Sequence, residues 1–379
     1  MSSRKKIRLF KPSVGKEEIN SIKKIFKKSW LGYGSTVKEF ELKFSNFIGT
    51  KYAIGLNSCT AALHLALAVN NFQKKKKVLL PAMTFSATAA AALYCGLTPV
   101  FVDVNNNDLN INFEDLKKKY TKDCVAVMAV HFGGHPCQME KIVPWARKKN
   151  MVVIEDCAHT CGGFYKGKKL GSWGDYGCFS FEDKKVITTG DGGILCTNRK
   201  DKIALLRSLS FHGWSSDPLQ RFLKKSKKKH WYYEIQNLGF KYNMNNLQAS
   251  IGISQLKKLS RLNQKRILIL KKYLSGIKNC KNINLAFPYK LDKSSYWLLT
   301  LRSKKRDKLI NYLKSKGISA GVHLMPLPLH PLYKKYKNKV NNSMKVWKEL
   351  FSLPFFPDIK KNQIDYVLKF VKEFDSKQK

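Results

Sequence analysis

The pattern of apolar and polar positions divides the first half of the chain into short alternating segments. Helix-like stretches occur at 60–69, 86–96 and 113–120. Seven apolar runs of strand length lie within 51–58, 76–82, 99–104, 124–132, 151–157, 176–181 and 192–198. The last two runs follow each other closely, like a hairpin. This alternation is typical of an α/β domain, and it predicts a sheet of about seven strands between helices.

The second half of the chain has a different pattern. Residues 245–268 have the apolar spacing of a helix, which we expect to carry the chain out of the first domain. Segments 294–303, 306–324 and 364–374 suggest a smaller α+β domain with proline-punctuated loops between them. We therefore expect an N-terminal arm (1–15), a large domain (16–260) and a small C-terminal domain (261–379). A chain of 379 residues is long enough for two domains.

The charge of the chain is strongly positive, with 71 Lys and Arg against 26 Asp and Glu and a formal net charge of +45. Such an excess invites a nucleic-acid interpretation. However, only ten of the basic residues are arginines, and base readout favours the arginine fork. The densest lysine runs, at 74–77 and 224–229, are expected in loops. We interpret the lysines as a solvated surface, whose field also suits an anionic small substrate.

The nine cysteines are scattered, and none belongs to a CxxC pair or a zinc-like cluster. The start of the sequence lacks the apolar segment of a secretory signal, and no apolar run is long enough to span a membrane. These features predict a reduced cytoplasmic protein without disulfides, structural metal or membrane span.

Residues 58–60, Ser-Cys-Thr, stand between the first strand and an apolar helix. Free backbone N–H groups and the helix dipole suit a phosphate at such a place. Simple N-capping by Ser58 or Thr60 explains the same residues. The motif by itself leaves both interpretations open.

Two acids, Glu155 and Asp156, end the fifth apolar run, at the strand edge where α/β sheets keep their ligand sites. Acids there can bind metal, act as a base or pair with a cationic ring nitrogen, and Asp156 can also cap a helix. His159 follows three residues later, and by itself it fits a core or surface position equally well.

Lys184 and Lys185 lie between the sixth strand and a Thr-Thr-Gly-Asp-Gly-Gly turn. A buried lysine loses its charge readily because desolvation disfavours the ammonium form, so it can form a Schiff base. A phosphate cradle, an acid facing a ring nitrogen and such a lysine are together the requirements for binding pyridoxal 5′-phosphate (PLP).

In the order and spacing of its motifs, the chain resembles the DegT/DnrJ/StrS family of nucleotide-sugar aminotransferases. The motifs include GLNSCTAALHLAL (55–67), VIEDCAHT (153–160), KKVITTGDGG (184–193) and LGFKYNMNNLQASIGISQL (238–256). The resemblance covers nearly the whole chain. It implies the fold type I architecture of PLP enzymes, with a mixed seven-stranded sheet between helices in the large, PLP-binding domain and a smaller α+β domain.

The resemblance also implies a role for each matching residue. Lys185 would bind the cofactor covalently and Asp156 would pair with its ring nitrogen. Phe85 would stack on the ring and His159 would lie near its 3-oxygen. The remaining implied residues are Cys59, Thr60 and Ser180 for the phosphate, Lys241 for the phosphate of the neighbouring subunit, and His323 and His330 for the sugar nucleotide. Cys59 and Lys241 depart from the family pattern, which commonly has Gly or Ser and Asn there.

The function implied is transamination of a nucleoside-diphosphate keto sugar by a cytoplasmic homodimer with shared active sites. L-Glutamate would be the donor, a 4-keto-6-deoxy hexose is the favoured acceptor, and 3-keto amination remains open. Lys185 argues against the sugar dehydrases of the family, some of which carry histidine at that position. A catalytically inactive regulatory or nucleic-acid-binding protein on the same fold is the alternative, because fold alone does not prove activity.

Overall fold

The computed structural model describes residues 6–215, 232–291 and 295–377. The centre of the molecule is a seven-stranded sheet in the order β1-β9-β8-β5-β4-β2-β3. Its strands are β1 (Tyr52–Leu56), β2 (Lys77–Pro81), β3 (Thr98–Val102), β4 (Cys124–Val130), β5 (Val152–Asp156), β8 (Tyr176–Ser180) and β9 (Gly193–Thr197). All seven predicted strands are confirmed. β9 is antiparallel to both of its neighbours and the other pairs are parallel, so the sheet is mixed as expected.

Helices cover both faces of this sheet because alternate strand residues point to opposite sides. In β2, Val78 and Leu80 pack in one apolar cluster with α3 (Cys59–Ala68) and α4 (Ser86–Tyr94). Leu79 points the other way, into a cluster with α6 (Met139–Lys148) and Leu116 of α5 (Phe113–Lys119). Near β1 and β8, this second face is covered by α2 (Ser35–Ile48) and the first part of a long helix, α9 (Asn246–Ile277).

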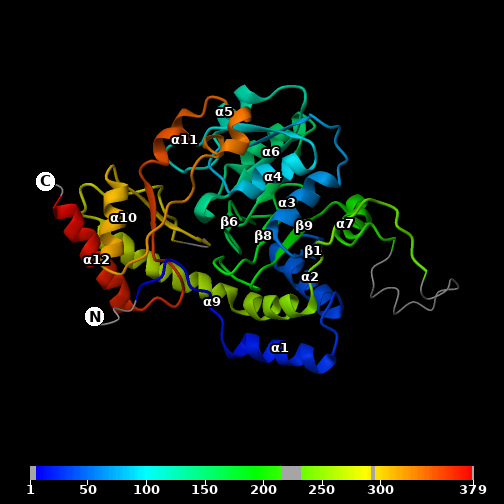
Figure 1. Cartoon of the computed structure of the whole chain (residues 1–379), viewed down its shortest axis with the longest axis horizontal. Coiled ribbons are helices and arrows are strands. Elements are labelled where there is room, and N and C mark those ends of the chain that lie inside the picture. Colours follow the sequence, from blue (N-terminus) through cyan, green and yellow to red (C-terminus); the bar gives the residue numbers. More distant parts are fainter. Residues whose placement is uncertain (1–5, 216–231, 292–294, 378–379) are drawn as a thin grey trace.

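The long helix α9 connects the two parts of the molecule (Figure 1). Its Leu259 and Leu262 belong to a core cluster of the large domain, whereas Ile269 and Tyr273 belong to the core of the C-terminal part. The predicted helix at 245–268 is therefore present but continues to Ile277. The division that we placed after residue 260 falls inside this unbroken helix, so no loop separates the two parts there.

The C-terminal part contains a three-stranded antiparallel sheet in the order β10-β11-β12, with strands Asn284–Leu285, Leu299–Arg302 and Leu350–Leu353. Its main helices are α10 (Arg306–Ser315) and α12 (Lys361–Ser376), with the short α11 (Asn341–Val346). The N-terminal arm is attached here too, because Ile7 forms a parallel bridge with Ile318. Helix α1 (Lys16–Lys28) then packs along α9.

The described elements also include a two-stranded hairpin of β6 (Phe164–Tyr165) and β7 (Lys168–Lys169), and helix α7 (Ile203–Ser210) after β9. Of the lysine run at 74–77, the first three residues lie outside strands as predicted, but Lys77 begins β2. The run at 224–229 lies outside the described residues. All nine cysteines are free. In the described part of the chain, no helix is both long enough and apolar enough to span a membrane.

Candidate active site

A cavity of about 390 Å³ lies at the carboxyl edge of the parallel strands, where α/β sheets bind ligands. The ends of β1, β5 and β8 meet there, together with the loop after β2. Eight residues predicted from the sequence line this cavity: Cys59, Thr60, Phe85, Asp156, His159, Ser180, Lys185 and His323. Residues distributed over more than 260 positions of the chain are thus brought to one place.

The two adjacent lysines of the 184–193 motif differ in their environments. The Lys184 side chain is 55% exposed and forms ion pairs with Glu182 (3.3 Å) and Asp183 (4.0 Å). In contrast, the Lys185 Nζ lies 3.8 Å from the centroid of the Trp297 ring. Burial lowers the pKa of Lys185, although nearby Asp156 acts in the opposite direction. Lys185 is therefore the lysine whose surroundings favour an uncharged amine.

Asp156 ends β5 and is buried, and hydrogen bonds hold its carboxylate in place. Its Oδ1 accepts from the Ala158 N–H (3.1 Å) and its Oδ2 accepts from the Thr88 hydroxyl (2.8 Å). Burial raises the pKa of Asp156, partly offset by these donors and by Lys185. A cationic ring nitrogen would relieve that desolvation cost, so this acid suits a pyridinium partner.

The N-terminus of α3 borders the same cavity. Ser58 is the N-cap, and its Oγ accepts a hydrogen bond from the Ala61 N–H (3.1 Å). The first helical residues, Cys59 and Thr60, line the cavity, and unpaired N–H groups of a helix N-terminus favour an anion. Ser180, at the end of β8, lines the cavity as well. Capping and phosphate binding are therefore compatible here, since Ser58 leaves part of the helix end free.

Aromatic rings form the opposite wall of the cavity. The His159 ring stacks on Trp297 with centroids 4.3 Å apart, and Phe10 stacks on Trp297 at 5.2 Å. His323 meets Trp297 edge-on at 5.5 Å. The Nδ1 of His159 accepts from the Gly133 N–H (3.3 Å), which leaves the proton on Nε2. Burial lowers the pKa of His159 well below its usual value and that of His323 to about 4, so both rings are neutral near pH 7.

Phe85 immediately precedes α4 and lines the cavity while being 60% exposed. A large apolar ring left open to solvent beside a cavity is suited to cover a planar ligand. Together with the amine of Lys185, the carboxylate of Asp156 and the end of α3, it gives the site the groups that PLP requires.

Two predicted residues lie outside this cavity. The Nζ of Lys241 lies 4.1 Å from the centroid of the Phe211 ring, and the Lys241 backbone carbonyl accepts a hydrogen bond from Asn57 (3.2 Å). His330 caps a 3-10 turn and does not line the cavity around Lys185. Within one protomer, neither is brought to Lys185.

Glu155 has a structural environment although it neighbours Asp156. It is fully buried and accepts hydrogen bonds from the backbone N–H groups of Gly171, Trp173 and Gly174 at 2.7–2.8 Å. Its Oε2 also lies 3.2 Å from the His131 Nε2. Glu155, His131 and Cys157 have ligand atoms within 4.8 Å of one another, but these hydrogen bonds already use the carboxylate to fix the loop before β8.

Phe10, Trp297 and Thr88 contribute to the site but were not found from the sequence. Phe10 and Trp297 lie outside the motifs that carry the resemblance, and nothing in their local sequence marks them. Thr88 left a weak signal, because it is a hydroxyl residue within the otherwise apolar start of an alanine-rich helix. It is fully buried and donates to Asp156.

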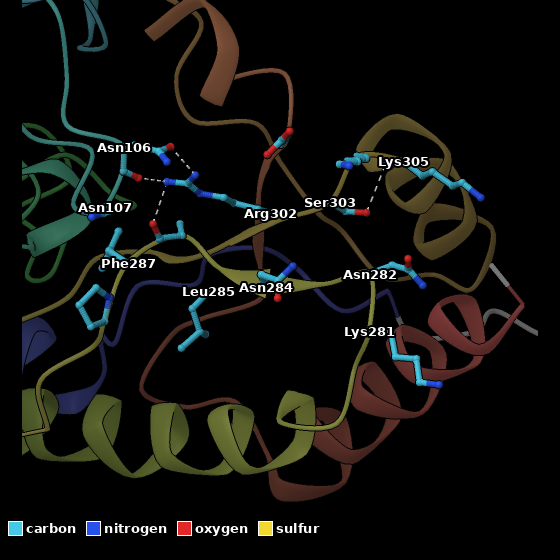
Figure 2. A pocket seen from close by; sticks show the side chains of 14 residues that line it. Asn106, Asn107, Lys281, Asn282, Asn284, Leu285, Phe287, Arg302, Ser303 and Lys305 are labelled. Atoms are coloured by element: carbon cyan, nitrogen blue, oxygen red, sulfur yellow. Dashed lines mark hydrogen bonds between the residues drawn. The ribbon is translucent and has the colours of Figure 1, made fainter. Parts of the chain in front are cut away.

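A larger cavity, of about 940 Å³, lies on the C-terminal part and shares no lining residue with the first (Figure 2). Arg302 is its central basic side chain, but its guanidinium is engaged by Asn106 and by the carbonyl of Ala286. These hydrogen bonds tie the turn after β3 to the small sheet. We therefore assign Arg302 a structural role.

The fold and the cavity around Lys185 define a fold type I PLP enzyme. Residues 12–372 match the DegT/DnrJ/EryC1/StrS aminotransferase family, and the chain belongs to it. It is a PLP-dependent enzyme of the sugar-aminotransferase class. The resemblance inferred from the motifs is thereby confirmed, as are the fold class and the cofactor.

Curated relatives match over nearly their whole length. An uncharacterized protein of Methanocaldococcus jannaschii is 39% identical over 380 residues, which cover 98% of each chain. The spore coat polysaccharide biosynthesis protein SpsC of Bacillus subtilis is 36% identical, covering 96% of this chain and 95% of that protein. GDP-perosamine synthase of Escherichia coli O157:H7 is 33% identical, covering 98% and 99%.

Solved structures agree with this assignment. Spr1654 of Streptococcus pneumoniae in its PMP form has a TM-score of 0.90 at 27% identity, covering 98% of this chain and 99% of that one. It has also been solved in its PLP form. PseC of Helicobacter pylori, an aminotransferase involved in pseudoaminic acid biosynthesis, has a TM-score of 0.91 at 26% identity, covering 98% and 100%.

Proposed function

We propose that the chain transfers the amino group of L-glutamate to a keto sugar carried on a nucleoside diphosphate. The favoured acceptor is a 4-keto-6-deoxy hexose, and the product would be an amino sugar for glycan or glycoconjugate synthesis. The observation that carries the proposal is the cavity in which Lys185 and Asp156 meet at the carboxyl edge of the sheet. The sequence similarity of the chain to GDP-perosamine synthase supports a nucleotide-linked sugar as the acceptor.

The proposed chemistry assigns a proton-transfer role to Lys185. PLP, when bound, supplies the carbonyl carbon that accepts the amino group and the conjugated ring that withdraws electrons. Burial lowers the pKa of the Lys185 Nζ and so favours the unprotonated amine, the form that can act as a base. The Lys185 Nζ would take the proton from the α-carbon of glutamate and hold it for transfer, with PLP supplying the carbon that receives it. The same amine would work in reverse when the sugar is aminated, and the kinetics should be ping-pong.

Other residues would position the reacting groups. Asp156 would hold a proton on the ring nitrogen, because a buried carboxylate favours a cationic neighbour. Neutral His159 has its Nε2–H free to donate to the ring's 3-oxygen. Cys59 and Thr60 would bind the phosphate with backbone N–H groups, assisted by the Ser180 hydroxyl. Phe85 would cover one face of the ring.

The proposal includes a cytoplasmic homodimer whose active sites are shared. Lys241 would bind the phosphate of the partner subunit's cofactor, and His330 would approach the sugar nucleotide together with His323. The position of Lys241 outside its own cavity is compatible with a role in a second protomer.

A panel of nucleotide-linked keto sugars, each assayed with L-glutamate, tests the proposal. We expect formation of an amino sugar and 2-oxoglutarate in equal amounts, with the 4-keto-6-deoxy sugars the best acceptors. A preference for 3-keto sugars would show that the enzyme aminates C3 and not C4. Absence of 2-oxoglutarate formation with every acceptor would contradict the glutamate assignment.

A further inference from the structure

The loop that bears Lys185 is held at both of the peptide carbonyls that flank this lysine. The Trp297 Nε1–H donates to the Lys184 carbonyl at 2.7 Å. On the other side, the Arg266 Nη2 donates to the Val186 carbonyl at 2.9 Å. Neither donor belongs to the sheet or to the lysine motif.

Arg266 is the last of three α9 residues that hold this loop. The Gln248 Nε2 donates to the Asp191 carbonyl (2.8 Å), and the Gln255 Oε1 accepts from the Thr188 N–H (3.3 Å). Gln248, Gln255 and Arg266 are separated by 7 and 11 residues, close to two and three helical turns, so they lie on one face of α9. The loop runs antiparallel to the helix, and its residues meet this face in reverse order.

Arg266 is buried, and among the described residues its guanidinium makes a single hydrogen bond, to the Val186 carbonyl. The side chain is only 5% exposed, and burial lowers its pKa to about 10. Its Nε and Nη1 atoms are buried without a hydrogen-bond partner within the part of the chain that the structure describes. Unpaired buried donors are unfavourable, and an apolar side chain of similar length is often equally stable at such a site. A role in stability alone therefore does not explain this arginine.

Both donors lie where the two parts of the molecule join. Arg266 falls between Leu262, in the core of the large domain, and Ile269, in the C-terminal core. Trp297 comes just before β11 and is 6% exposed, with its ring face toward the Lys185 Nζ. The contacts that fix the lysine's backbone thus come from the junction with the small domain.

We propose that Trp297 and Arg266 are positioning residues that clamp the peptide groups on either side of Lys185. With both carbonyls fixed, the Lys185 backbone cannot turn, and its amine is held over the Trp297 ring and within the cavity. The clamp limits how far the Lys185 Nζ can move between the amino-group donor, glutamate, and the cofactor. Its effect on turnover rests on the proposed function, whereas its effect on the loop does not.

Amide hydrogen exchange of the cofactor-free protein tests the clamp directly. Trp297→Phe keeps an aromatic ring but removes the N–H donor, and Arg266→Met keeps the length but removes the guanidinium. We expect each to accelerate exchange in peptides covering residues 182–190 roughly five- to tenfold, the factor expected for one lost hydrogen bond. Arg266→Lys, which retains one donor, should restore slower exchange.

Asn263→Leu is the matched control. Asn263 lies one turn before Arg266 on α9, and its Nδ2 donates to the Cys161 carbonyl (3.0 Å), away from the lysine loop. Its loss should leave exchange of residues 182–190 unchanged. If Trp297→Phe and Arg266→Met also leave this exchange at the rate of the wild type and the control, the proposal that these residues clamp the loop is contradicted.

Steady-state kinetics give a second, separate measurement. With glutamate as donor, both clamp variants should lower kcat roughly tenfold while KM stays within about threefold, because positioning of a base acts on the chemical step. Arg266→Lys should recover part of kcat. Faster loop exchange with unchanged kcat would contradict the catalytic role of the clamp. A wild-type protein that does not use glutamate would refute the proposed function and leave the exchange result standing.

Discussion

The two sides of the cavity are built on different principles. On the sheet side, Asp156, Ser180 and the Ser58 cap are placed by strand ends and by a helix N-terminus, with backbone N–H groups as near neighbours. On the opposite side, Phe10, Trp297 and His323 come from the arm and the C-terminal part and are placed by ring contacts. The first side supplies charge and hydrogen bonds, and the second supplies an apolar wall without a charged group near pH 7.

This difference shows why Lys185 lies between them. Its pKa depends on two opposing effects, because burial between the two sides disfavours the ammonium form and the Asp156 carboxylate favours it. A lysine with Asp156 alone would stay charged, and a lysine with the aromatic wall alone would lack a counter-charge. The following predictions perturb one side at a time.

The largest effect is expected where the two sides meet. Lys185→Ala should abolish turnover and covalent attachment of the cofactor, because no other amine occupies this position. Lys184→Ala should keep both, since its exposed side chain pairs with Glu182 and Asp183. Absorbance spectra before and after borohydride treatment measure attachment, and mass spectrometry of the reduced enzyme locates it. An adduct found on Lys184 would reverse this assignment.

The sheet side is tested by Asp156→Asn. An amide cannot stabilise a proton on the ring nitrogen by charge, so turnover should fall by about 10²- to 10³-fold, the typical effect of removing one electrostatic group from an active site. The protein should remain folded because the Asn oxygen can still accept from the Ala158 N–H, while the Thr88 hydroxyl can turn to accept from the Asn NH2 group and donate to Thr84. Circular dichroism checks the fold and a glutamate assay checks turnover. Turnover close to wild type would show that Asp156 does not face the ring nitrogen.

Lys241 tests whether a second protomer completes the sheet side. A dianionic phosphate held by amides and hydroxyls gains from a nearby cation, so Lys241→Ala should weaken cofactor retention several-fold, by about 1 kcal/mol. Equilibrium dialysis against PLP measures this loss. Lys185 should still react with the cofactor in this variant.

Mixing variants then places Lys241 in its own or the neighbouring site. If Lys241→Ala impairs turnover substantially, exchange of its subunits with inactive Lys185→Ala subunits should restore some activity. In a shared-site heterodimer, one site lacks both groups and the other has both intact. Heterodimers that form without regaining activity would place Lys241 outside the partner's site, and the aminotransferase assignment would be unaffected.

The smallest effect concerns the aromatic wall. The pKa of His323 is lowered to about 4 in the folded chain, against about 6.5 when unfolded. The unfolded state therefore binds more protons between these values, so His323 makes stability fall as pH drops from about 6.5 to 4. His323→Gln should reduce this slope by at most about 1.4 kcal/mol per pH unit. Urea unfolding at several pH values measures it, and an unchanged slope would contradict the buried, neutral state of His323.

The sheet and its side of the cavity could be predicted because their signals are local. Each strand is a short apolar run; Asp156 and Ser180 end such strands, and Lys185 follows β8 after a short loop. The family resemblance then gave each a role, and the structure brings these residues into one cavity. Their chemical roles stay predictions until the variants above are measured.

The aromatic wall was predicted only through its two histidines, His159 and His323. Stacking of Phe10 on Trp297 joins residues 287 positions apart, and neither has a periodic pattern that points to the other. The helix through the expected domain boundary was predicted, but its continuation to Ile277 was not, for a related reason. Helix periodicity shows where a helix is possible, whereas the change of core along α9 depends on packing between distant segments.

The position of β1 has a consequence for the order in which the site can form during synthesis. β1 lies at the edge of the large sheet, and its strand partner is β9, with Tyr52 opposite Thr197 and Leu56 opposite Gly193. A growing chain must therefore leave β1 without its neighbour while more than a hundred further residues are made. Such distant pairing slows folding because a long loop must close first. The N-terminus of α3, which follows β1, and the loop that carries Lys185, which precedes β9, therefore reach their native relative positions only once these two strands pair.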